Sequence, residues 1–456
     1  MTRLMGWIDE RFPLTKLWTE HAAGYYAPKN FNFWYYFGSL AMFVLVIQVV
    51  TGIFLTMHYK PDAGAAFASV EHIMRDVNWG WLIRYMHSTG ASAFFIVVYL
   101  HMFRAFLYGS YKSPRELLWV FGMFLYVCLM AEAFMGYLLP WGQMSFWGAQ
   151  VIVNLFGTIN TGLAEWIRGD YVVSDATLTR FFALHVAAIP LVLVGLAVIH
   201  IMALHEVGSN NPDGVEIKKR KNAEGIPVDG IPFHPYYTVK DMVGTVLFLF
   251  FFAIVIFSVP EMGGYFLEHA NFQPADPLKT PEHIAPVWYF TPFYSVLRAI
   301  PHPLIGVLAM GAAVVVLFFM PWIDRNPIKS VRYRSSLFRI NLLVFAITFI
   351  VLGVYGTMPA TPVRGEIAAR LSEIYFLFFF VLWFYSKPRS AGVTFIWSVF
   401  WLAVLALIDF VRFNENVATE TYAGWFAPAV YLLAMLVLPL VTSWNSERPV
   451  PEGVRA

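Results

Sequence analysis

Ten long apolar segments constrain the fold of this chain more than any other feature of its sequence. A helix needs about 20 residues to cross the hydrocarbon of a bilayer, where every backbone polar group must be bonded within the protein. With 59% hydrophobic and only 13% charged residues, the chain is predicted to be an all-α polytopic membrane protein. We place its transmembrane helices at about 34–57, 82–107, 117–138, 178–204, 242–259, 293–321, 338–357, 367–386, 391–412 and 424–444.

The distribution of Lys and Arg among the loops predicts the orientation of these helices. One set of loops is rich in both residues, as in KKRK at 218–221, whereas loops 58–81, 139–177 and 260–292 contain fewer. Short loops rich in Lys and Arg stay on the cytoplasmic side of a membrane. We therefore expect both termini in the cytoplasm and the three long loops on the outer face.

Two of the segments each contain a pair of histidines in helical register. His87 and His101 are separated by about four helical turns, as are His185 and His200, whose interval is one residue longer. At about 100° and 1.5 Å per residue, each pair faces one side of its helix at two levels about 21 Å apart. Both segments run from the outer face inward, so His87 should face His185, and His101 should face His200. An unpartnered imidazole is costly in hydrocarbon, and four of them without a cysteine cluster favour two bis-histidine haems.

Glycines in the two neighbouring segments repeat the spacing of the first histidine pair. Gly38 and Gly52 are separated by the same interval as His87 and His101, and so are Gly122 and Gly136. These segments run the opposite way, which places Gly52 and Gly136 at the outer level and Gly38 and Gly122 at the inner level. Glycine lets a flat macrocycle approach a helix closely, although membrane helices also use it for packing. Two pairs at matching depths favour the first interpretation, a di-haem four-helix bundle.

Two arginines lie close to the histidines of the first pair, one turn of helix away. Arg84 precedes His87 and Arg104 follows His101, towards opposite faces of the membrane. They are candidates to pair with haem propionates, and the alternative is that they are ordinary anchors at the membrane interface.

Several long motifs occur in the order of one known family. They are LPWGQMSFWGA at 139–149, RFFALH at 180–185, HEVGSNNPDG at 205–214, IPFHPYYTVKD at 231–241 and PVWY at 286–289. Over roughly residues 25–385 the sequence resembles cytochrome b, the membrane subunit of the quinol–cytochrome c reductase (complex III). The resemblance implies a di-haem four-helix bundle at 1–215 and a C-terminal cytochrome b region with the outer quinol-site loop at 216–390. Residues 391–456 are an extra helical hairpin and tail, for which the sequence suggests no chemical role.

The resemblance also implies the activity. A low-potential haem b is expected on His87 and His185, and a high-potential haem b on His101 and His200. Such proteins oxidise ubiquinol or a related quinol at an outer site. They pass electrons through both haems to ubiquinone or a related quinone at a cytoplasmic site, which contributes to proton translocation. The implied partners are a Rieske iron–sulfur protein, a membrane-anchored c-type cytochrome, a second copy of the complex, quinone and lipids, with no nucleic acid. The implied location is the bacterial inner membrane.

Family positions assign the two quinone sites. Where the family usually has Pro-Glu-Trp-Tyr, this chain has Val287 and therefore lacks the carboxylate that accepts a proton from quinol. Glu268 and Glu282 are nearby candidates, and we hypothesise that Glu268 takes the role; a solvated loop acid is the alternative. The other predicted outer-site residues are Tyr137, Tyr294, Pro286, Trp288 and Tyr289, with a pocket wall of Phe134, Gly148, Ala149 and Ile152. The predicted inner-site residues are His205, Ser209, Lys240 and Asp241.

Two other functions compete with this interpretation. A transporter could use intramembrane histidines to relay protons, but the chain lacks the internal repeats of many transporters. A plastoquinol-type relative would be split into two shorter chains, whereas this single chain continues through residue 386.

Overall fold

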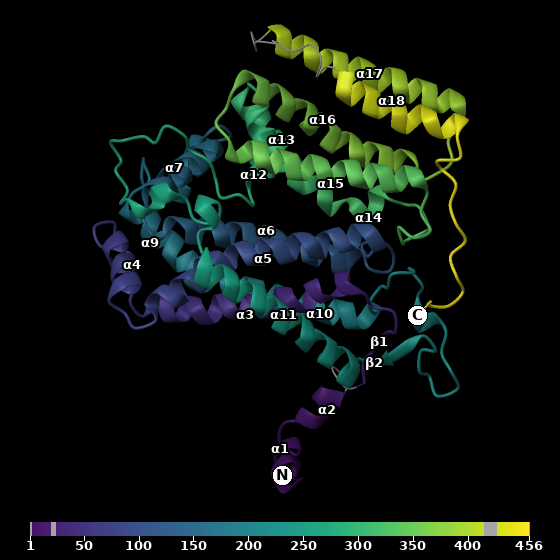
Figure 1. Cartoon of the computed structure of the whole chain (residues 1–456), viewed down its shortest axis with the longest axis horizontal. Helices are drawn as coiled ribbons and strands as arrows, with labels where there is room; N and C mark the ends of the chain where they lie inside the picture. Colours follow the sequence, from purple (N-terminus) through teal and green to yellow (C-terminus); the bar gives the residue numbers. More distant parts are fainter. Residues whose placement is uncertain (1, 20–23, 415–425, 456) are drawn as a thin grey trace.

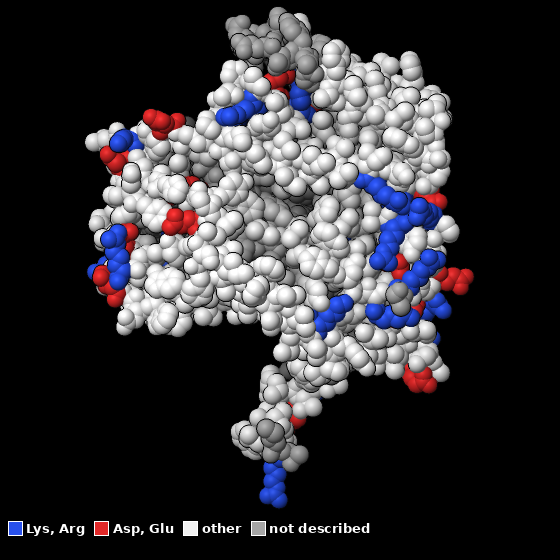
Figure 2. All heavy atoms as spheres, viewed as in Figure 1, with Lys and Arg blue, Asp and Glu red and all other residues white. Residues whose placement is uncertain are grey.

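The computed structural model describes residues 2–19, 24–414 and 426–455. It confirms an all-α architecture, because eight helices in this part of the chain are long and apolar enough to span a membrane. Charged side chains gather towards the ends of the molecule and leave a broad uncharged band between them (Figure 2). The eight spans are Phe33–Thr56, Gly80–Tyr108, Glu116–Leu138, Asp175–Val207, Phe233–Ser258, Ser336–Thr357, Pro362–Phe384 and Ala391–Val411.

The remaining two predicted segments differ from expectation. The prediction of one continuous helix at 293–321 is wrong, because the chain forms α12 (Thr291–Arg298), α13 (Pro303–Phe318) and α14 (Met320–Ile323). Pro301 and Pro303 lie at the first break, and proline disfavours helix both at its own position and at the preceding residue. The last segment is the shorter helix α18 (Phe426–Val441), and the predicted residues 424 and 425 lie outside the described chain.

Four helices form the bundle that carries the histidines. They are α3 (Tyr36–Thr56), α5 (Gly80–Tyr108), α6 (Glu116–Leu138) and α10 (Ile189–Val207), and they run side by side in Figure 1. Helix α3 packs on α5 and α6 on α10, while α11 (Thr238–Ser258) covers α3 and α5. The bundle therefore consists of two helix pairs, each of one histidine helix and one glycine helix.

A continuous apolar core joins this bundle to the second half of the chain. Buried Phe95 and Tyr126 belong to the same cluster as Phe345 on α15 (Ser336–Thr357) and Phe378 on α16 (Pro362–Phe384). On the far side of α16 lie α17 (Ala391–Asn414) and α18 (Figure 1). The extra hairpin is thus outside the bundle and touches it only through the second half of the chain.

Short elements cap the two ends of the helices (Figure 1). At one end lie α4 (Ala66–Arg75), α7 (Gln143–Gly157), α8 (Thr161–Arg168) and α9 (Asp175–Ala183). At the other end β1 (Tyr26–Pro28) pairs antiparallel with β2 (Gly230–Pro232), and the short helices α1 (Thr2–Asp9) and α2 (Leu14–Trp18) extend away from the body. We call these the α7 end and the β1 end; the predicted outer loops lie at the α7 end.

Two histidine-lined cavities in the helix bundle

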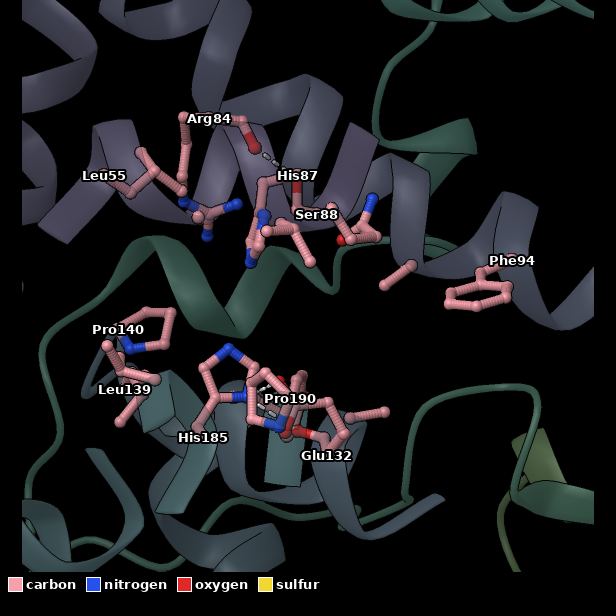
Figure 3. A pocket seen from close by; sticks show the side chains of 18 of the residues that line it. Leu55, Arg84, His87, Ser88, Phe94, Glu132, Leu139, Pro140, His185 and Pro190 are labelled. Atoms are coloured by element: carbon pink, nitrogen blue, oxygen red, sulfur yellow. Dashed lines mark hydrogen bonds and ion pairs between the residues drawn. The ribbon is translucent and has the colours of Figure 1, made fainter. Parts of the chain in front are cut away.

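The first cavity lies near the α7 end and has a volume of about 570 Å³. His87 on α5 and His185, just before α10, face each other across it (Figure 3). Their ring centres are 6.1 Å apart, and the planes of the two rings are almost perpendicular, at 89°. Arg84 also lines this cavity, one turn of α5 from His87.

The second cavity lies nearer the β1 end and has a volume of about 380 Å³. His101 on α5 and His200 on α10 line it, with their ring centres 6.5 Å apart. Arg104 lines the same cavity, donates to Ser110 Oγ at 3.0 Å and lies 4.8 Å above the ring of Tyr35. The structure therefore brings the four histidines together in the two predicted pairs.

The spacing of the rings suits a metal between each pair. Two imidazoles that bind one ion from opposite sides at about 2 Å each have ring centres roughly 6 Å apart. In addition, the buried Arg104 Nε has no hydrogen-bond partner among the described residues, as expected beside a site made for an acidic group. The donor set is purely histidine, which is the usual axial ligation of a b-type haem.

The four glycines leave room for such a group. A Cβ atom on Gly136 would lie only 2.3 Å from Cε1 of His185, and one on Gly52 would lie 3.2 Å from Cε1 of His87. In the second cavity, the corresponding distances are 3.3 Å from Gly38 to His101 and 3.2 Å from Gly122 to His200. Any larger residue at these positions would therefore crowd the histidine rings. These residues fit two haems in the predicted positions.

A π-helical turn explains why the interval of the second histidine pair is one residue longer than that of the first. His185 lies within this turn, η3 (Leu184–Ala188), between α9 and α10. A π turn contains one more residue than an α turn, so it absorbs the extra residue and restores the angular match. Pro190 follows directly at the start of α10. Because it lacks a backbone N–H, it cannot donate the α-helical hydrogen bond to the carbonyl four residues earlier.

One residue at the first cavity was missed by the sequence analysis. Glu132 on α6 lies behind His185, and its Oε1 and its backbone oxygen are 3.0 and 2.9 Å from the imidazole Nδ1 (Figure 3). The sequence does contain a signal for Glu132. An acidic residue inside the apolar segment 117–138 costs free energy in a membrane, so it marks a functional position.

The predicted inner-site residues all line the second cavity. His205 stacks on the ring of Tyr25 at 4.5 Å, and the Tyr25 hydroxyl lies 2.8 Å from Ser209 Oγ. Lys240 Nζ donates to the backbone oxygen of Phe31 at 2.5 Å, and Asp241 is hydrogen-bonded to Ser39. Tyr25 also belongs to this group, although nothing in its local sequence distinguished it.

Glu268 lies in the loop after α11 and contacts the wall of the first cavity. Its Oε2 accepts hydrogen bonds from the Tyr137 hydroxyl at 2.8 Å and from Asn271 Nδ2 at 3.2 Å. Burial raises the pKa of the Glu268 carboxyl to about 7. Tyr137 and Asn271 line the cavity. The alternative candidate Glu282 is exposed.

The Pro286–Tyr289 motif packs against α5. Val287 is buried, the Trp288 indole donates to Ser92 Oγ at 3.0 Å, and Tyr289 stacks on Phe95 at 3.9 Å. Val287 and Tyr289 line the first cavity. Gly148 approaches Tyr137, while the Tyr294 hydroxyl donates to the Ile284 carbonyl at 3.3 Å. The predicted outer-site residues that do not themselves line the cavity are Glu268, Phe134, Gly148, Ala149, Ile152, Pro286, Trp288 and Tyr294.

Comparisons with known proteins identify the family. The model of cytochrome b/b6/petB matches residues 22–208, and that of cytochrome b (C-terminal)/b6/petD matches residues 274–377. Cytochrome b of Allochromatium vinosum is 57% identical over 86% of this chain and 99% of its own length. Cytochrome b of Rickettsia bellii is 46% identical over 83% of this chain and 92% of its own. A chain of the solved "Hyperthermophilic respiratory Complex III" is 38% identical, with a TM-score of 0.77 over 83% of this chain and 98% of its own.

The fold and its cavities define an integral, multi-pass membrane protein with a histidine-lined helix bundle. The chain belongs to the cytochrome b/b6 family, as its motifs indicated, and membership implies that it binds haem b.

Proposed function

We propose that this chain is the cytochrome b subunit of a respiratory quinol–cytochrome c oxidoreductase. The observation that carries the proposal is the arrangement of four histidines in two facing pairs, with ring centres 6.1 and 6.5 Å apart and a glycine against each ring. A transporter that relays protons through histidines would not need this spacing or these glycines.

The two cavities would each hold one haem b, which supplies a one-electron carrier. His87 and His185 would bind the low-potential haem, and His101 and His200 the high-potential haem. Gly52 and Gly136, and likewise Gly38 and Gly122, leave space for the macrocycle. Arg84 and Arg104 line the cavities and would pair with the propionates, since a guanidinium binds a carboxylate well in a dry site.

Quinol oxidation at the outer site releases two electrons and two protons. One electron would go to a Rieske protein and the other through the two haem sites to quinone at the inner site. Because Val287 cannot accept a proton, Glu268 would accept one through its hydrogen bond with Tyr137. Pro286, Trp288, Tyr289 and Tyr294, with Phe134, Gly148, Ala149 and Ile152, would shape the outer quinol site around this pair.

Quinone reduction at the inner site consumes two electrons and two protons. His205, Ser209, Lys240 and Asp241 gather at the second cavity and include groups that can donate protons. Their position beside His101 and His200 supports transfer from the inner haem site to a quinone held by these residues.

We further propose a bacterial inner-membrane location with both termini in the cytoplasm. The Lys- and Arg-rich segment 218–221 lies at the β1 end, opposite the α7 end. A Rieske protein, a c-type cytochrome and a second copy of the complex would be the partners. Support comes from the Complex III neighbour and from a 44% identical relative in Bradyrhizobium diazoefficiens named "Cytochrome b/c1". Residues 1–215, 216–390 and 391–456 would be the three units of the chain.

A redox titration of the purified complex tests this function. We expect two b-type components at different potentials in the optical difference spectrum, and quinol-dependent reduction of cytochrome c. Absence of b-type bands would refute the proposal, whereas a transporter would retain its function without them.

A further inference from the structure

Glu132 places a carboxylate directly behind one of the four histidines. Its Oε1 lies 3.0 Å from His185 Nδ1, on the side of the ring away from His87. The side chain is only 16% exposed, and its other oxygen, Oε2, has no hydrogen-bond partner among the described residues. A buried carboxylate inside a membrane helix costs free energy, so its contact with His185 points to a functional role.

In the part of the chain that the structure describes, the other three histidines have no acidic partner at Nδ1. His87 Nδ1 lies 2.9 Å from the Thr51 hydroxyl, and His101 Nδ1 lies 3.4 Å from a guanidinium nitrogen of Arg104. His200 Nδ1 has no hydrogen-bond partner among the described residues, and the backbone of Leu118 lies near it. The two cavities therefore have the same arrangement of glycines and histidines. They differ because, in the described chain, only His185, in the first cavity, has a carboxylate beside its Nδ1.

The equivalent position in the second cavity shows the difference most directly. Leu118 precedes Glu132 on α6 by the same interval that separates Gly122 from Gly136. The Glu132 backbone oxygen lies 2.9 Å from His185 Nδ1, and the Leu118 backbone is the corresponding group near His200. A backbone group of α6 thus lies near the histidine in both cavities, and among the described residues a carboxylate beside this ring is present only in the first.

The chemical effect of this addition has a definite sign. When Nε2 of a histidine binds iron, Nδ1 carries the hydrogen and donates it to a neighbouring acceptor, which makes the ligand more basic. A carboxylate is a stronger acceptor than a carbonyl and also adds negative charge. Both effects stabilise the ferric state, which carries one more positive charge than the ferrous state, and so lower the reduction potential.

We propose that Glu132 is a positioning residue that lowers the reduction potential of the haem held by His87 and His185. The inference rests on the proposed function, because it requires a haem in that cavity. It assigns the potential difference between the two haems partly to one side chain on α6. Glu132 thereby favours electron transfer from the outer cavity towards the inner one.

The decisive measurement is a potentiometric titration of both haems in the purified complex, monitored optically. In Glu132→Gln the amide remains a hydrogen-bonding group of the same size but loses the charge. We expect the lower potential to rise by about 59 mV, a tenfold change in a one-electron equilibrium, and the higher potential to stay unchanged. An unchanged lower potential with both haems present would overturn the inference.

The reciprocal variant provides a matched control. Leu118→Glu should lower the potential of the haem on His101 and His200, whereas the neutral Leu118→Gln should shift it much less. If Glu132→Gln fails to retain the first haem, Glu132→Asp is titrated instead, since its shorter side chain withdraws the carboxylate from Nδ1. A potential equal to that of the unmodified protein would again overturn the inference. This outcome differs from a failure of the proposed function. If the chain bound no haem, neither the unmodified protein nor any variant would show a b-type component in the titration.

Discussion

Replacement of Glu268 by glutamine should change both the rate and the pH dependence of quinol oxidation. Glu268 accepts a hydrogen bond from Tyr137 at 2.8 Å, and Tyr137 lines the first cavity. Only the ionised carboxylate can accept a proton. With a pKa of about 7, about a tenth of the molecules carry this carboxylate at pH 6, about half at pH 7 and about nine-tenths at pH 8. The rate should therefore rise with pH through about pH 7 and level off above about pH 8.

Glu268→Gln removes the titrating group but keeps the size of the side chain. A positioned proton acceptor contributes on the order of 10²-fold or more, and we expect a loss near the lower end because water can also accept a proton. The residual rate should no longer rise between about pH 6 and about pH 8. The assay is steady-state quinol–cytochrome c reductase activity of the purified complex, measured across this pH range.

Two further variants make this test specific. The exposed Glu282 belongs to the same loop, so Glu282→Gln should leave the rate and its pH profile unchanged. The double variant Glu268→Gln with Val287→Glu places a carboxylate back in the motif. It should restore part of the rate, since Val287 lines the same cavity as Tyr137, the partner of Glu268. If Glu268→Gln retains the full rate and the original pH profile, the proposed role of Glu268 is refuted.

Three other variants test separate parts of the structure. Gly136→Ala should abolish only the lower-potential b-type component in the optical spectrum, because the added Cβ would lie 2.3 Å from the His185 ring. Asp241→Asn should slow oxidation of the reduced b haems by added quinone at least about tenfold, as measured by stopped-flow absorbance, if this carboxylate supplies protons at the inner site. Arg370→Leu should lower the thermal unfolding temperature of the detergent-solubilised protein, because Arg370 pairs with Glu366, Glu373 and Asp409, and loss of one partner of a buried pair costs about 3–5 kcal/mol.

The long apolar segments and the histidine spacing could be predicted from sequence because both depend on local geometry. Eight of the ten predicted segments, all except 293–321 and 424–444, correspond to spanning helices among the described residues. The helix at 293–321 was mispredicted because the sequence Ile-Pro-His-Pro interrupts an otherwise apolar stretch. A hydrophobicity profile does not reveal such a break. The two prolines do predict it, because proline disfavours the helical conformation of the residue before it.

Contacts between distant segments could not be predicted in the same way. Glu268 meets Tyr137 across 131 residues of sequence, and Tyr25 meets Ser209 across 184. The resemblance to the family identified Tyr137 and Ser209, but neither Tyr25 nor Glu132, the partner of His185, followed from it. The longer interval of the second histidine pair likewise became understandable only with the π turn at His185. Local periodicity thus determines which residues face inward, while tertiary packing determines which of them meet.

The polar contacts of the extra hairpin also depend on packing. Asp409 on α17 pairs with Arg370 on α16, and the Tyr431 hydroxyl on α18 donates to Asn341 Oδ1 on α15. Beyond α18, the backbone N–H groups of Val454 and Arg455 donate to Asp229 and Asp213 at the β1 end. The hairpin is therefore attached to α15 and α16, and the tail to the β1 end, which a count of apolar residues could not indicate.

Four single substitutions of the facing histidines test the central claim most directly. We expect His87→Leu and His185→Leu each to remove the lower-potential b-type component from a redox titration, and His101→Leu and His200→Leu each to remove the higher-potential one. The exposed His58→Leu, at the α7 end, should retain both components. Retention of both components in all four cavity variants would contradict the account.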